Sequence, residues 1–179
     1  MQFSGTSTAS NGTFTINGGA AVIGVCGTNG GTMQFSGTST ASNGTFTING
    51  GAGVVMGVCG NNGGTMQFSG TSTASNGTFT VYGGTNGTYA ENSTGGLVEF
   101  LDSSTAGNGI FTLDDADNFN GPGIVNFFGT STAGDGNFTL VGGGFLFQAG
   151  AQMNFHDSST ASNGTFAING GAGGTFGES

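Results

Sequence analysis

The chain has 179 residues, among them 41 Gly, 17 Phe and one Pro, and its only charged side chains are nine carboxylates. A net charge of -9 without any Lys or Arg excludes nucleic acid and anionic membrane surfaces as partners, because no side chain can replace the counterions of phosphate groups. No apolar run reaches the roughly 18 residues of a membrane span, so we expect no membrane insertion.

A block of residues recurs six times along the chain. The segment MQFSGTSTASNGTFTIN at 1–17 returns unchanged at 33–49, and residues 66–80 repeat its first fifteen letters. We place the coils of a single domain, residues 1–179, near positions 1, 33, 66, 98, 125 and 153, with 27–33 residues per coil. A period of this length is typical of a solenoid, in which each repeat buries its apolar face against its neighbours.

Each repeat is predicted to contain three short strands. In the first repeat they lie near MQF (1–3), GTFTI (12–16) and AAVIGVC (20–26), where apolar residues alternate between Gly-rich corners. No segment carries the periodicity of a helix. The expected fold is therefore all-β, a parallel β-solenoid (β-helix) of about six coils. Successive coils lie about 4.8 Å apart in such a stack, so equivalent residues lie one above another.

Two phenylalanines per repeat, eleven residues apart in the sequence, are expected to point inward. Stacked coils turn them into two columns that form the apolar core, and each ring contributes roughly 1.5–3 kcal/mol through burial. This core ladder consists of Phe3, Phe35, Phe68, Phe100, Phe127 and Phe155 in one column and Phe14, Phe46, Phe79, Phe111, Phe138 and Phe166 in the other.

A corner between the first two strands carries Asn or Asp followed by Gly. An Asn-Gly pair can supply the left-handed backbone of a sharp bend, and stacked amides can hydrogen-bond along a column. The predicted corner ladder consists of Asn11, Asn43, Asn76, Asn108, Asp135 and Asn163. We expect these residues to stabilise the corner and not to catalyse a reaction.

The pattern in FLDSSTAGNGIFTL (100–113) and FFGTSTAGDGNFTL (127–140) resembles the Ser-Thr-Ala-Gly-Asn repeats of β-helical passengers in bacterial autotransporter-like and adhesin-like surface proteins. The resemblance extends over nearly the whole chain. It implies secretion, an extracellular or cell-surface location and an extended rod. Such a motif specifies architecture far better than function.

The sequence offers little chemistry for an enzyme. His156 is the only imidazole and is expected to be an exposed strand residue, and the recurrent GTSTA segment lacks the second Gly of a nucleophile elbow. Asp114, Asp115 and Asp117 could hold calcium through oxygen ligands, but their spacing does not match an EF-hand loop. We favour a solvated loop and expect no cofactor, no metal and no enzymatic activity.

Cys26 and Cys59 occur in the same GVCG segment of two successive coils. The expected Cα separation of about 4.8 Å is within the range of a disulfide, although parallel side chains hold the Cβ atoms slightly too far apart. The sequence therefore leaves two alternatives, an intercoil disulfide or a pair of packed thiols.

Three functions fit these features. The first is a non-enzymatic structural protein that assembles head to tail with itself into a filament and bundles laterally through its charge-poor surface. The second is an ice-binding solenoid, because Thr13 and Thr15 recur in the next two repeats as outward Thr-x-Thr pairs. The third is a passenger segment of a secreted adhesin. The Thr pairs decay in the later repeats, which favours the filament.

Overall fold

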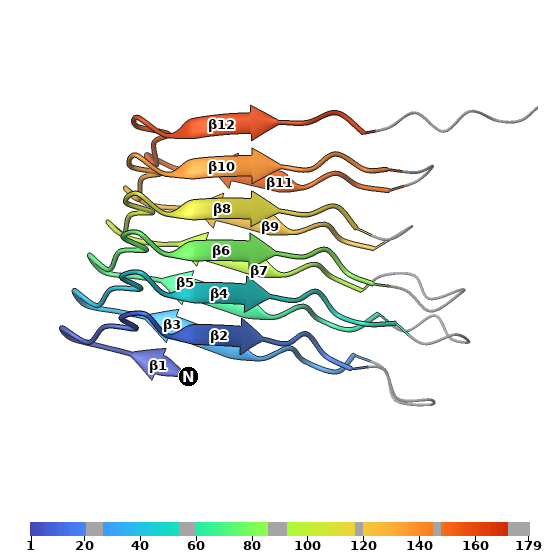
Figure 1. Cartoon of the computed structure of the whole chain (residues 1–179), viewed down its shortest axis with the longest axis horizontal. Coiled ribbons are helices and arrows are strands. Elements are labelled where there is room, and N and C mark those ends of the chain that lie inside the picture. Colours follow the sequence, from blue (N-terminus) through green and yellow to red (C-terminus); the bar gives the residue numbers. More distant parts are fainter. Residues whose placement is uncertain (21–26, 54–59, 86–92, 117–119, 145–147, 172–179) are drawn as a thin grey trace, which may run out of the picture.

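The computed structural model describes residues 1–20, 27–53, 60–85, 93–116, 120–144 and 148–171. These residues form an all-β parallel solenoid built from two six-stranded sheets. The sheets lie one behind the other in Figure 1, and their strands run in opposite directions. Within the described ranges, no helix has the length and apolar character needed to cross a membrane.

Each repeat supplies one strand to each sheet. The first sheet has the order β1-β3-β5-β7-β9-β11 and the second β12-β10-β8-β6-β4-β2. The strands of the first sheet are β1 (Gln2–Phe3), β3 (Thr32–Phe35), β5 (Thr65–Phe68), β7 (Leu97–Phe100), β9 (Ile124–Phe127) and β11 (Gln152–Phe155). Those of the second are β2 (Thr13–Ile16), β4 (Thr45–Ile48), β6 (Thr78–Val81), β8 (Ile110–Leu113), β10 (Asn137–Leu140) and β12 (Thr165–Ile168).

The register of both sheets pairs equivalent residues of successive repeats. Phe35 pairs with Phe68 in the first sheet, and Phe46 pairs with Phe79 in the second. The same register persists where the repeat shortens, since Phe100 pairs with Phe127. The variation in repeat length is therefore confined to the segments that connect each strand of the second sheet to the first-sheet strand of the next coil. The predicted β-solenoid and its vertical alignment of equivalent residues are confirmed.

The described part of each repeat contains two strands and not the predicted three. Between the two strands, isolated parallel bridges join the central Thr of successive Ser-Thr-Ala segments, namely Thr8, Thr40, Thr73, Thr105, Thr132 and Thr160. The predicted third strand coincides largely with residues 21–26 and 54–59, which lie outside the described residues.

Each residue of Ser-Thr-Ala has its own structural role at this corner. In the second repeat, the hydroxyl of Ser39 is buried and donates a hydrogen bond to the carbonyl oxygen of Phe3 in the coil before (3.4 Å). Thr40 Oγ1 accepts a hydrogen bond from the backbone N–H of Ser42 (2.9 Å). Ala41 is fully buried and is small enough to allow the chain to bend over the core.

The prediction that the Asn-Gly pair supplies the left-handed backbone is wrong. The positive φ angle belongs instead to the residue that precedes each Asn or Asp. In five of the six repeats, the backbone N–H of this residue donates to the hydroxyl of the Thr two residues before it, and this hydrogen bond places the bend at that residue. These residues are Ser10 (φ 53°), Ser42 (53°), Ser75 (53°), Gly107 (60°), Gly134 (61°) and Ser162 (48°). The Gly of the pair is needed instead for close approach of a ring, because a Cβ atom on Gly44 would lie 2.7 Å from Phe46.

Candidate functional site

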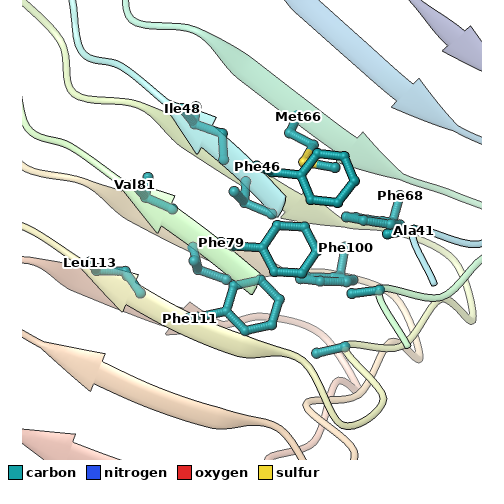
Figure 2. Close-up of a cluster of buried hydrophobic side chains, with 14 of the residues drawn as sticks. Ala41, Phe46, Ile48, Met66, Phe68, Phe79, Val81, Phe100, Phe111 and Leu113 are labelled. Carbon is teal, nitrogen blue, oxygen red and sulfur yellow. The ribbon is translucent and has the colours of Figure 1, made fainter. Parts of the chain in front are cut away.

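Two columns of stacked phenylalanine rings fill the space between the sheets (Figure 2). Neighbouring rings of the column that begins at Phe3 have centroids 4.6–4.9 Å apart and interplanar angles of 4–12°. In the column that begins at Phe14, the corresponding values are 4.4–5.3 Å and 6–13°. The spacing of the coils therefore sets the stacking distance of the rings.

The two columns also contact each other within every repeat. Phe68 and Phe79, for example, meet edge to face with centroids 6.1 Å apart and an interplanar angle of 76°. The other five repeats show the same arrangement, with centroid distances of 5.9–6.3 Å. Both geometries are favourable for the quadrupole of the ring, so each ring of an inner coil contacts two rings along the column and one across it.

Burial of the core changes abruptly at the last described coil. Ile168 is 76% exposed, whereas its counterparts Leu140 and Ile48 are 6% and 0% exposed. Phe155 is 38% exposed, whereas Phe127 is fully buried. These residues line an apolar hollow at the end of the stack together with Leu140, Met153, Ala161 and Phe166. In the preceding coils, the equivalent side chains are covered by the coil that follows, whereas here they are exposed.

The first coil is covered more completely. Phe3 and Phe14 are partly buried, Ile16 is 4% exposed and Met1 is 67% exposed. Each of the two phenylalanines has a ring of the next coil on one side, Phe35 on Phe3 and Phe46 on Phe14. Both phenylalanine columns therefore end in a ring that is stacked on one face only within the described residues.

The predicted corner ladder is a file of hydrogen-bonded amides. From the second coil on, the amide nitrogen of each Asn in the ladder donates to the side-chain oxygen in the preceding coil. The bonds run from Asn43 to Asn11, from Asn76 to Asn43 and from Asn108 to Asn76, each 3.3 Å long, and from Asn163 to Asp135, 3.0 Å long. The carboxylate of Asp135 therefore serves as an acceptor where the other repeats use an amide.

A second file of polar side chains runs along the outer face of the first sheet, and the sequence analysis missed it. Gln34 donates to Gln67 (3.3 Å), Gln67 to Glu99 (3.2 Å) and Asn154 to Asn126 (3.0 Å). The sequence signal for this file was the alternation of residues in the first-sheet strands, for example Met-Gln-Phe, where the polar residue lies between two inward apolar residues. These side chains add hydrogen bonds between coils on the side away from the core.

Asp102 and Asp157 lie just after strands of the first sheet and have a role that the sequence analysis also missed. Asp102 Oδ2 accepts the N–H of Gly70 in the coil before (2.8 Å), and Asp157 Oδ2 accepts that of Gly129 (3.0 Å). Both aspartates have φ 56°, in a position where other repeats have Gly. A short side chain with a carboxylate can adopt this backbone and satisfy a neighbouring N–H.

The residues considered for catalysis or metal binding do not come together. His156 is exposed and stacks on Phe128, with ring centroids 4.6 Å apart. Asp115 Oδ2 accepts the N–H of Gly144 (3.0 Å), while Asp117 lies outside the described residues. Across the described ranges, no group of three or more His, Cys, Asp or Glu side chains is placed to hold a metal ion.

The remaining predicted residues have mixed outcomes. Cys26 and Cys59 both lie outside the described residues, so the choice between a disulfide and two thiols stays open. The threonines of the predicted Thr-x-Thr face are aligned in register in β2, β4 and β6, with Thr13 beside Thr45 and Thr45 beside Thr78.

The fold and its columns define a repeat protein of the parallel β-solenoid class. No protein-family model, curated protein sequence or solved structure matches the chain.

Proposed function

We propose that this chain is a non-enzymatic structural protein that works outside the cell or on its surface, as a β-solenoid subunit that assembles head to tail into a filament. The observation that carries the proposal is the apolar end of the stack, where Phe155 and Ile168 are 38% and 76% exposed although they are core residues by register. An exposed apolar patch of this kind marks a contact surface.

The strand edges support the same conclusion. β11 and β12 each pair with one neighbour among the described strands, as do β1 and β2 at the other end. A parallel strand with a free edge can accept another strand through its backbone N–H and C=O groups. Contact between the two different ends is heterologous and does not close, which generates a filament. Each subunit would lengthen the filament by roughly 29 Å at the usual spacing of strands.

The proposed location has two sources of support. The chain contains no Lys or Arg, so it offers no trypsin-type cleavage site to proteases outside cells. The Ser-Thr-Ala pattern resembles that of secreted surface proteins, among which fibres, coats and adhesins are all found.

A charge-poor surface rich in Gly, Thr and Asn also favours lateral bundling of filaments.

A second candidate function, ice binding, is supported by the aligned threonines of β2, β4 and β6. The regular array ends with β6, because the equivalent of Thr78 is Ile110 in β8 and Asn137 in β10. β-Strand propensity alone accounts for outward threonines. A passenger segment of a secreted adhesin is a third candidate, in which further coils or domains of the same protein would cover the ends.

The experiment that tests the filament is sedimentation velocity over a concentration series, combined with negative-stain electron microscopy. Filaments of unlimited length are expected for the wild-type chain. Ile168→Asp should raise the concentration needed for assembly, whereas Ile110→Asp should not, although Ile110 is itself 51% exposed on the side of the stack. A chain that stays monomeric at high concentration contradicts the proposal, and a monomer that alters ice growth supports the second candidate.

A further inference from the structure

The two ends of the stack match a junction that already exists inside the chain. Between the second and third coils, residues 33–51 are covered by the coil that begins with residues 66–80. Residues 1–15 are identical to residues 66–80. The first fifteen residues of a second copy therefore have the same sequence as a segment that is seen to stack on the second coil.

The last described coil is also similar to the coil on which residues 66–80 stack, since 14 of the 19 residues at 153–171 are identical to those at 33–51. Residues 161–171 read ASNGTFAINGG and residues 41–51 read ASNGTFTINGG, with one difference at Ala167. The inward residues of the two coils are the same. They are Met153 and Met33, Phe155 and Phe35, Ala161 and Ala41, Phe166 and Phe46, and Ile168 and Ile48. The apolar end thus presents the same inward side chains that residues 66–80 cover within the chain.

Charge favours the contact between unlike ends over the contact between two C-terminal ends. All nine carboxylates lie between Glu91 and Glu178, and residues 1–90 contain no charged side chain. Two C-terminal coils in contact would bring their Asp157 side chains into one interface, where like charges repel. The first coil adds no charged side chain to that interface.

From these observations, and resting on the proposed filament, we propose that the first coil of a second copy takes the place of a seventh coil without a shift in register. Phe3 of the incoming copy then stacks on Phe155, and its Phe14 stacks on Phe166. On the outer face of the first sheet, Gln2 of the incoming copy lies beside Asn154, as Gln34 lies beside Gln67 inside the chain.

The register can be tested with charges at Gln2 and Asn154, which meet only across this junction. Gln2→Asp combined with Asn154→Asp places like charges side by side, and Gln2→Lys combined with Asn154→Asp places opposite charges there. The critical concentration for assembly should differ roughly 3- to 10-fold between the two variants, with the opposite pair assembling more readily. The difference should shrink at high salt.

A matched control moves the first charge one coil inward. Gln34→Asp and Gln34→Lys, each combined with Asn154→Asp, carry the same net charges in the same file, but residue 34 does not reach the junction. These two variants should differ less than 2-fold, a margin of about 0.4 kcal/mol. Circular dichroism of the dilute chains verifies that all four variants keep their strands.

The outcomes separate the register from the filament. Filaments whose assembly responds to the Gln2 and Asn154 charges, and not to the control, support the junction. Filaments that respond equally to both pairs overturn the register and leave the proposed function standing. A wild-type chain that forms no filament overturns both.

Discussion

The ring of Phe79 lies against the backbone of Gly77, so closely that a Cβ atom on residue 77 would sit 2.8 Å from the ring atoms Cε2 and Cζ. The same contact recurs in every repeat, because a Gly always precedes the second Phe by two residues. A Cβ atom would lie 2.5–2.8 Å from the nearest ring atom at Gly12, Gly44, Gly77, Gly109, Gly136 and Gly164. This Gly lets the ring reach the column.

Gly77→Ala should therefore destabilise the fold by about 1–3 kcal/mol, since a ring held between Phe46 and Phe111 cannot move aside without disturbing its neighbours. Gly170→Ala is the matched control, because nothing lies within 4 Å of a Cβ atom at that position. Urea unfolding followed by circular dichroism measures both. Equal effects of the two substitutions would contradict the role assigned to Gly77.

The edge-to-face contact of Phe68 with Phe79 should appear as a coupling energy. In a double-mutant cycle of Phe68→Leu and Phe79→Leu, the two effects on the free energy of unfolding should deviate from additivity by about 0.5–1.5 kcal/mol. Phe35→Leu with Phe138→Leu is the control cycle, because those rings lie in different columns and far-separated coils. In the control cycle, the two changes in the free energy of unfolding should be additive. A coupling energy as large as that between Phe68 and Phe79 would show that the coupling does not arise from direct contact between the two rings.

Two buried serines of the Ser-Thr-Ala segments should respond differently to replacement by Ala. Ser104 Oγ donates to the carbonyl oxygen of Leu101 (2.7 Å), so Ser104→Ala should cost about 1 kcal/mol. Ser131 Oγ is buried and has no hydrogen-bond partner among the described residues, so Ser131→Ala should be neutral or stabilise the protein by about 1 kcal/mol. Thermal or urea unfolding of the two variants distinguishes them. A loss for Ser131→Ala matching that of Ser104→Ala would point to an additional partner.

The corner ladder should tolerate an additional carboxylate at one place better than at another. Asn108 neighbours Asp135 in the next coil, whereas Asn43 has Asn neighbours on both sides. Asn108→Asp should thus destabilise the fold more than Asn43→Asp by about 0.2–1 kcal/mol at low ionic strength. The difference should vanish in an Asp135→Asn background and shrink with added salt. A difference that persists in that background would rule out repulsion between the two carboxylates as its cause.

The sequence by itself determined the fold class, the register of both sheets and the identity of the stacked residues. A repeat whose strands are parallel and equivalent has one alignment that keeps every apolar residue inside, so Phe35 must lie between Phe3 and Phe68. The amide file of Asn43 and Asn76 follows from the same alignment.

Only the tertiary structure decided how each corner bends and which end of the core is exposed. Asn-Gly is a turn signal at the level of the sequence, yet in the third repeat the residue with the left-handed backbone is Ser75. The hydroxyl of Thr73 accepts the N–H of Ser75, and the Gly of the pair is required where the ring of Phe79 packs against the backbone. The acceptor roles of Asp102 and Asp157 depend on a backbone N–H from the coil before. Hydrogen bonds and ring contacts between coils depend on where the chain passes in three dimensions, and a linear repeat does not contain that information.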